Sequence, residues 1–238
     1  MITVAHSMRS FWHSSIGKKI LVAFTGIILL LFLPAHLAGN ALIFLGEHAF
    51  NKYALWLHEL GHGTAIWIAR IVLLVALIVH VQLTIQLTIR NKAARPDYSH
   101  PATVRTSLSS RMMIWSGLTI LAFVIYHICH FTIRIGNDYN SSAYQTSLPG
   151  HQDTVHDVYR MTVDGFSHPA NVLFYTIAIS ILCSHLSHGV ASVFQTLGLR
   201  STKNRALITL AARAYAIVIW LGFLSIPISI FIFGLGRS

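Results

Sequence analysis

Histidine is the residue type in this chain whose number and spacing best suit chemistry, with 15 copies among 238 residues. Two of them stand in the stretch HELGH, from His58 to His62, which matches the H-E-x-x-H signature of zinc proteases. On a helix this spacing puts two imidazoles on one face, where they can share a metal, while the glutamate activates a bound water. The stretch raises the hypothesis of an intramembrane zinc protease, with Asp164 as the nearest candidate for a third ligand.

The composition around this stretch is that of a membrane protein. Hydrophobic residues make up 54% of the chain and charged residues only 10%. Five apolar stretches have the length of about 20 residues that a membrane-crossing helix needs. They lie near 20–46, 66–89, 112–133, 170–195 and 214–235. We therefore expect an all-α membrane protein, a five transmembrane helix bundle that forms one domain over residues 1–238.

Basic residues divide unevenly between the two sides of such a bundle. Twelve fall on one side, namely Arg9, Lys18, Lys19, Arg90, Lys92, Arg95, Arg105, Arg111, Arg200, Lys203, Arg205 and Arg213, and five on the other, namely Lys52, Arg70, Arg134, Arg160 and Arg237. Because cytoplasmic loops carry the excess of Lys and Arg, we expect a cytoplasmic N-terminus and an outer C-terminus. This distribution argues against a nucleic-acid partner despite the net charge of +10. The outer connection over 134–169 is expected to cap that face.

Six histidines lie inside the predicted spans, namely His36, His80, His127, His130, His185 and His188. An ionisable side chain at membrane depth is costly and marks a functional site by default. For any single one, a neutral histidine bonded to a neighbouring helix is the structural alternative. At about 1.5 Å per residue, His36 and His127 lie about 25 Å from the cytoplasmic basic residues, and His80 lies about 15 Å from them. His185 is near mid-membrane and leans inward.

These depths favour two pairs of ligands, His36 with His127 and His80 with His185. Two pairs of neutral imidazoles from facing helices are what bis-histidine ligation of two haems requires. A metal transporter would also use histidines, but it usually needs carboxylates or thiolates, and Asp and Glu are absent from these spans. One turn from proposed ligands, His130 and His188 are secondary candidates as replacement ligands, partners of a haem propionate or part of a quinone pocket.

The segments that hold these residues resemble the cytochrome b558 family, the single-chain dihaem membrane anchor of bacterial succinate dehydrogenase and fumarate reductase. The resemblance covers most of the chain. It is carried by FLPAHLAGN followed by HAFNKYA, by LWLHELGHGTAIWIARIVLLVALIVHVQLTIQLTIRNKAARPDYS, by SRMMIWSGLTILAFVIYHICHFTI and by FYTIAISILCSHLSHGVASVFQTLG.

The resemblance implies two haem b groups, the distal one held by His36 and His127 and the one nearer the cytoplasm by His80 and His185. It implies a multi-pass protein of the bacterial cytoplasmic membrane that anchors a flavoprotein subunit and an iron–sulfur subunit. Electrons would pass between the iron–sulfur subunit and a membrane quinone, with menaquinone as the expected type. Some relatives have a Glu two residues before the fourth ligand, where this chain has Cys183, so no transmembrane proton path is carried over.

The resemblance also makes Glu59 a candidate for quinol proton handling, because an acidic residue at a comparable distance after the first ligand does this in the fumarate reductase branch. His58 and His62 flank it, and a solvated interfacial Glu is the alternative. Four functions remain open at this point. They are the succinate dehydrogenase anchor, a fumarate reductase anchor that oxidises quinol, a dihaem anchor of another oxidoreductase such as nitrate reductase or a hydrogenase, and the zinc protease.

Overall fold

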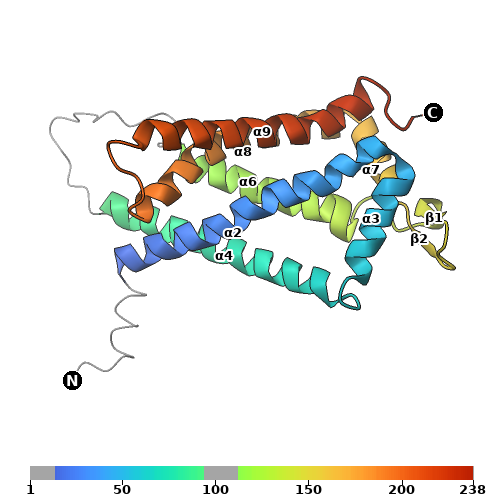
Figure 1. Ribbon diagram of the computed structural model, residues 1–238, viewed down its shortest axis with the longest axis horizontal. Helices are drawn as coiled ribbons and strands as arrows, with labels where there is room; N and C mark the ends of the chain where they lie inside the picture. The colour runs from blue at the N-terminus through green and yellow to red at the C-terminus, as the bar shows by residue number, and fades with distance from the viewer. Residues whose placement is uncertain (1–13, 94–111, 238) are drawn as a thin grey trace. The chain divides into compact units, whose positions relative to one another are not determined.

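Five long helices dominate the computed structural model, which describes residues 14–93 and 112–237. They are α2 (Ser15–Ala41), α4 (Thr64–Ala93), α6 (Met113–His127), α8 (Pro169–Thr196) and α9 (Arg205–Phe231) (Figure 1). The 3-10 turn η1 (Leu42–Leu45) directly continues α2, and the π-helical segment η2 (Ile128–Ile133) directly continues α6. The connections hold the 3-10 turn η3 (Ser142–Tyr144), the strands β1 (Gln145–Ser147) and β2 (Thr154–His156), and the helices α3 (Glu47–Glu59) and α7 (Val158–Ser167).

Within the described part of the chain, the prediction of five helices long and apolar enough to cross a membrane is confirmed. Five segments are long and apolar enough to span a bilayer, namely Ser15–Leu45, Thr64–Ala93, Met113–Ile133, Pro169–Thr196 and Arg205–Phe231. Large apolar side chains such as Leu31, at 69% exposure, and Leu221, at 56%, face outward from these helices. Lipid is the solvent that such surfaces require, so the helices indicate a membrane protein. Four of the twelve basic residues used for orientation, Arg9, Arg95, Arg105 and Arg111, lie outside the described residues.

The fifth helix is longer than its apolar stretch. It begins at Arg205, whereas the sequence predicted a span from 214. Hydropathy marks the part of a helix that suits hydrocarbon, but a helix also continues through polar ends when its residues favour that conformation. The segment RALITLAAR consists mostly of strong helix formers, so α9 extends beyond the predicted span.

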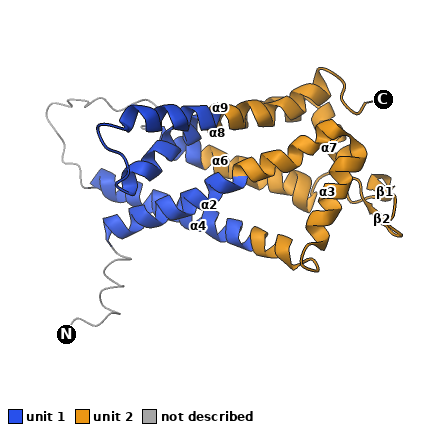
Figure 2. Ribbon diagram, viewed as in Figure 1, with its two compact units in different colours: residues 1–32, 71–117, 184–216 blue, residues 33–70, 118–183, 217–238 orange. Residues whose placement is uncertain are grey.

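The chain divides into two compact units (Figure 2). Unit 1 comprises Met1–Phe32, Ile71–Gly117 and Ser184–Ala216, and unit 2 comprises Leu33–Arg70, Leu118–Cys183 and Ile217–Ser238. Each of the five long helices contributes one segment to each unit. His80, His185 and His188 belong to unit 1, and His36, His127 and His130 belong to unit 2.

Helix α2 continues through a proline because another helix replaces the missing backbone donor. Pro34 lies inside α2, two residues before His36. Proline has no N–H, so the carbonyl of Leu30, four residues earlier, loses its helical partner. The hydroxyl of Tyr215 in α9 donates to this carbonyl at 2.5 Å. The helix that carries His36 therefore stays intact at the proline.

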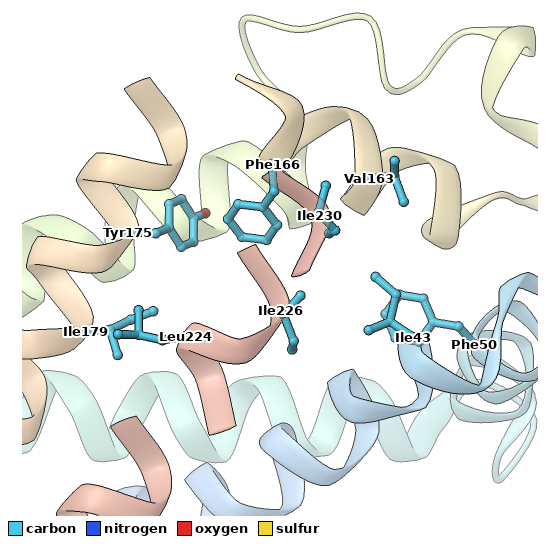
Figure 3. Close-up of a cluster of buried hydrophobic side chains, with 9 residues drawn as sticks. All are labelled: Ile43, Phe50, Val163, Phe166, Tyr175, Ile179, Leu224, Ile226 and Ile230. Carbon is cyan, nitrogen blue, oxygen red and sulfur yellow. The ribbon is translucent and has the colours of Figure 1, made fainter. Parts of the chain in front are cut away.

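The predicted outer connection is an ordered part of unit 2. Strands β1 and β2 pair antiparallel, with Thr146 opposite Val155. Helix α7 packs against α3, where buried Asn51 donates to Asp157 Oδ1 at 2.9 Å and accepts from the backbone N–H of Tyr159 at 3.0 Å. The apolar core of this unit joins α3 and α7 to the membrane helices (Figure 3). Its buried members are Ile43, Phe50, Val163, Phe166, Tyr175, Ile179, Leu224, Ile226 and Ile230.

Candidate functional site

The HELGH stretch is not one continuous helix. Helix α3 ends at Glu59, and Gly61, His62 and Gly63 adopt positive φ angles of 62°, 54° and 81° before α4 starts at Thr64. Glycine favours this left-handed backbone, and two glycines here flank the histidine. His58 therefore lies on α3 and His62 lies in a turn. The interpretation of the motif as one helix that carries both histidines is wrong. The physical reason is the pair of glycines, which ends the helix inside the motif.

A zinc site at this position has no geometric support. Among the residues that the structure describes, no three His, Cys, Asp or Glu side chains are grouped to hold a metal ion. Asp164, the proposed third ligand, accepts instead from the hydroxyl of Tyr144 at 3.0 Å and lies 3.7 Å from the Arg160 guanidinium. Glu59 lies 3.2 Å from His151 Nε2. Asp164 and Glu59, the acidic residues that a zinc protease would use here, thus contact other side chains.

In unit 1, His80 on α4 is fixed by α2. Its Nδ1 lies 3.2 Å from the carbonyl oxygen of Val22 and 3.2 Å from Thr25 Oγ1. The carbonyl can only accept, and the Thr25 hydroxyl donates to the carbonyl of Leu21 at 2.8 Å, so the proton must be on His80 Nδ1. This tautomer leaves the lone pair of Nε2 available for a metal.

His185 on α8 is held in the same way by α6. Its Nδ1 lies 3.0 Å from Ser116 Oγ, and the Ser116 hydroxyl donates to the carbonyl of Met113 at 3.1 Å. With the serine proton directed to the Met113 carbonyl, the serine oxygen accepts from His185 Nδ1–H, and Nε2 carries the lone pair. His80 and His185 are close enough for electrostatic interaction.

Each histidine of this pair also lies beside a glycine. A Cβ atom on Gly26 would be 3.3 Å from His80 Cε1, and one on Gly117 would be 3.5 Å from His185 Cε1. The first distance is tighter than an ordinary van der Waals contact, so Gly26 is needed for the close approach of the ring. The two supports share one local sequence, Thr25-Gly26 and Ser116-Gly117. This repeated hydroxyl–glycine dipeptide is a signal that the sequence analysis missed.

In unit 2, the structure brings His36 and His127 together. Their ring centroids are 5.9 Å apart and their planes are inclined by 83°. The Nδ1 of His127 lies 3.3 Å from the hydroxyl oxygen of Tyr175 on α8. Near His36, the side-chain nitrogen of Asn40 is 3.3 Å from Nδ1 and donates to the His36 backbone carbonyl at 2.7 Å. Among the four histidines predicted to bind haem, His36 is the one whose ring lies beside a side-chain amide nitrogen.

Three of the four residues fit bis-histidine haem ligation in their donor chemistry. Ligand histidines almost always donate their second ring N–H to a carbonyl, carboxylate or water oxygen. His80 and His185 do so, and Tyr175 offers His127 an oxygen acceptor. Metal–imidazole bonds are about 2 Å long, so two imidazoles that share one metal ion have ring centres on the order of 6 Å apart. The separation of the His36 and His127 rings matches this expectation.

The secondary candidates lie one turn away from these ligands in different surroundings. His130 is 7% exposed, and its Nδ1 is 3.2 Å from the same Tyr175 hydroxyl that meets His127. His188 is half-buried on α8, close enough to His185 and Arg200 for electrostatic interaction. Among the described residues, Cys183 is not part of a disulfide bond.

A cavity of about 170 Å³ adjoins the unit 2 histidine pair. Its lining comes from α2 and α3 and consists of His36, Gly39, Asn40, Phe50, Tyr53, Ala54, Leu57 and His58. Gly39 allows the close approach of Tyr53, since a Cβ there would be 2.6 Å from the tyrosine ring. His58 lines this cavity, whereas Glu59 is bonded to His151 on the loop between β1 and β2.

The Glu59 contact favours a protonated His151. Its Nδ1 lies 3.1 Å from the carbonyl oxygen of Asp153 and its Nε2 lies 3.2 Å from the Glu59 carboxylate. These two acceptors raise the pKa of His151. Glu59 thus has a titratable neighbour.

The chain was compared with protein-family models, with curated proteins and with solved structures. None of the three comparisons gives a match.

Proposed function

We propose that this chain is the dihaem membrane anchor of a succinate:quinone oxidoreductase, the succinate dehydrogenase of a bacterial cytoplasmic membrane. The observation that carries the proposal is the support of the membrane histidines. Three of the four candidates have Nδ1 within reach of an oxygen, and the Val22 carbonyl fixes the tautomer of His80 whose Nε2 can bind a metal. Histidines that bind a metal almost always have such a partner at the second ring nitrogen.

The chain's own residues would bind and orient the cofactors. His80 with His185, and His36 with His127, would hold one haem b each. When bound, the haems would supply one-electron transfer, with two imidazoles to hold each iron. Thr25, Ser116 and Tyr175 would keep the ligand rings in the correct tautomer and orientation. Hydrocarbon around the helices would exclude water from both pairs.

The cavity beside His36 supports a quinone site in unit 2. It is lined by apolar and aromatic side chains together with His58, a combination that suits a quinone ring with polar oxygens. His58 on its wall and Glu59 at the end of the same helix would exchange the quinol protons with the outer aqueous phase. In this proposal menaquinone is the electron acceptor, and the partner subunits are a flavoprotein and an iron–sulfur protein on the cytoplasmic side.

Spectroscopy of the purified chain tests the proposal directly. We expect reducible low-spin haem b at about two per polypeptide, and a folded preparation free of haem would contradict the proposal. A redox titration with succinate and with menaquinol on the purified complex distinguishes succinate oxidation from fumarate reduction. Co-purification of a nitrate reductase or a hydrogenase, instead of a flavoprotein that oxidises succinate, would assign the anchor to a different enzyme.

The substitution Glu59→Gln tests the quinone site separately. We expect quinone turnover to fall sharply while both haems remain, because the carboxylate lies outside both histidine pairs. Asp138→Asn, an acidic residue in the loop after the third span, is the matched control and should leave turnover unchanged. Turnover that is unaffected by Glu59→Gln would remove this residue from proton handling. Proteolytic activity lost in the same variant would revive the zinc protease.

A further inference from the structure

The hydroxyl of Tyr175 lies between two histidines of unit 2. Its oxygen is 3.3 Å from His127 Nδ1 and 3.2 Å from His130 Nδ1. Tyr175 is 3% exposed and His130 is 7% exposed, so bulk water does not reach this contact. A phenol has one proton to donate. The hydroxyl therefore donates to one of the two rings and accepts from the other.

The surroundings of His130 hold its ring in place. Its ring centroid lies 4.1 Å from that of Phe131 and 5.4 Å from that of Tyr126. Its backbone carbonyl accepts from the side-chain amide of Asn137 at 3.1 Å. Beside it, Tyr175 packs edge-on against Phe166 at 4.9 Å between centroids, and Figure 3 shows these two rings side by side. Both side chains are buried among these rings, and close packing restricts their reorientation.

Only one direction of this hydrogen-bonded chain is compatible with ligation by His127. If Tyr175 donated to His127, the proton of His127 would lie on Nε2, the nitrogen that a haem iron would need. If His127 donates to Tyr175, its Nε2 is free, and the phenolic proton must go to His130 Nδ1. His130 must then carry its own proton on Nε2.

We infer that His130 is not a ligand but a positioning residue that fixes the direction of the Tyr175 hydroxyl and, through it, the ligating tautomer of His127. This inference rests on the proposed haem function. It assigns one role to a histidine for which the sequence left three roles open. It also explains why the protein buries an ionisable side chain among aromatic rings.

Four variants of the purified complex test this role through the midpoint potential and ferric spectrum of each haem. Tyr175→Phe removes the acceptor from His127, so the ligand becomes less basic and the potential of one haem rises. His130→Leu leaves the buried hydroxyl with His127 as its only acceptor, so the same haem shifts further or is partly lost. His130→Asn keeps a side-chain oxygen as acceptor and should retain the wild-type potential.

The double variant Tyr175→Phe with His130→Leu gives the sharpest result. Because His130 acts through the hydroxyl, its loss should add nothing once that hydroxyl is absent, and the double variant should match Tyr175→Phe alone. Tyr126→Phe is the matched control, since its hydroxyl bonds Asn171 in the same aromatic cluster, and both haems should keep their potentials.

Three results would overturn the inference. They are additive shifts in the double variant, a shift in His130→Asn as large as in His130→Leu, and retention of both haems in His127→Ala when His130→Ala loses one. A wild-type complex that contains no haem would instead contradict the proposed function, independently of the role of His130.

Discussion

Units 1 and 2 each hold one histidine pair, but they support it with different chemistry. In unit 1 the supports are small hydroxyl side chains, Thr25 and Ser116, each followed by a glycine. A cluster of small and medium residues, Ala191, Ile208 and Ala212, packs in the same unit. In unit 2 the support is the phenol of Tyr175 inside an aromatic cluster, with a second histidine behind it.

The difference shows two ways to fix the tautomer of a histidine inside a membrane. A hydroxyl that already donates to its own helix can only accept from the neighbouring histidine, so the tautomer is fixed locally by the helix backbone. A phenol cannot reach its own backbone and needs an outside acceptor, which His130 provides. In unit 1 each histidine is thus held directly by groups of one neighbouring helix, whereas in unit 2 His127 depends on a chain of two residues, Tyr175 and His130.

The largest expected effect separates the two units by haem content. His36→Ala and His127→Ala should each remove the same haem and leave the other, whereas His80→Ala and His185→Ala should remove the second haem. Each substitution would delete one of the two histidines proposed to hold one haem. The measurement is the haem content and the resolved redox titration of each variant. If His36→Ala and His127→Ala removed different haems, the assignment of one haem to each unit would be wrong.

A stability prediction concerns the support of α2 in unit 1. Tyr215→Phe should lower the free energy of unfolding by about 1–3 kcal/mol, because it leaves the Leu30 carbonyl without a donor inside hydrocarbon. The measurement is unfolding in detergent or bicelles. In a Pro34→Ala background the backbone N–H returns, so the cost of Tyr215→Phe should become smaller. An equal cost in both backgrounds would remove the proline from this explanation.

Within unit 1, the two hydroxyl supports should differ in strength. Ser116→Ala removes the serine acceptor of His185, and we expect a loss of haem affinity of about tenfold. Thr25→Val should have a smaller effect, since the Val22 carbonyl remains as a second acceptor for His80. Haem retention during dilution or competition with apomyoglobin measures both. A larger effect at Thr25 would show that the backbone carbonyl does not substitute for the hydroxyl.

The smallest expected effect is a dependence of stability on pH that belongs to unit 2. Burial, with Arg134 nearby, lowers the pKa of His156 from 6.5 to about 4. Between these values the unfolded chain binds the proton and the folded chain does not, so stability is complete above pH 6.5 and decreases as the pH falls toward 4. His156→Gln should flatten the decrease in thermal unfolding midpoint over this range. An unchanged profile would place the titrating group elsewhere.

How far the sequence predicts this molecule varies from residue to residue. The apolar stretches predicted five spans because hydropathy over about 20 residues is a local property. The motif HELGH misled because its spacing suits a helix, while Gly61 and Gly63 end that helix in the folded chain. The short elements over 134–169 were missed, since β1 and β2 have three residues each and their pattern is too brief to detect.

The sequence by itself determined which segments suit the membrane and which of them carry histidines at comparable depth, because helix rise and apolar length are properties of consecutive residues. Only the tertiary structure decided which side chain from another helix meets three of these histidines. The partners stand far apart in the chain, 55 positions for His80 and Thr25, 69 for His185 and Ser116, and 48 for His127 and Tyr175. Such contacts depend on how neighbouring helices are rotated about their axes, which packing sets and a single helical pattern does not.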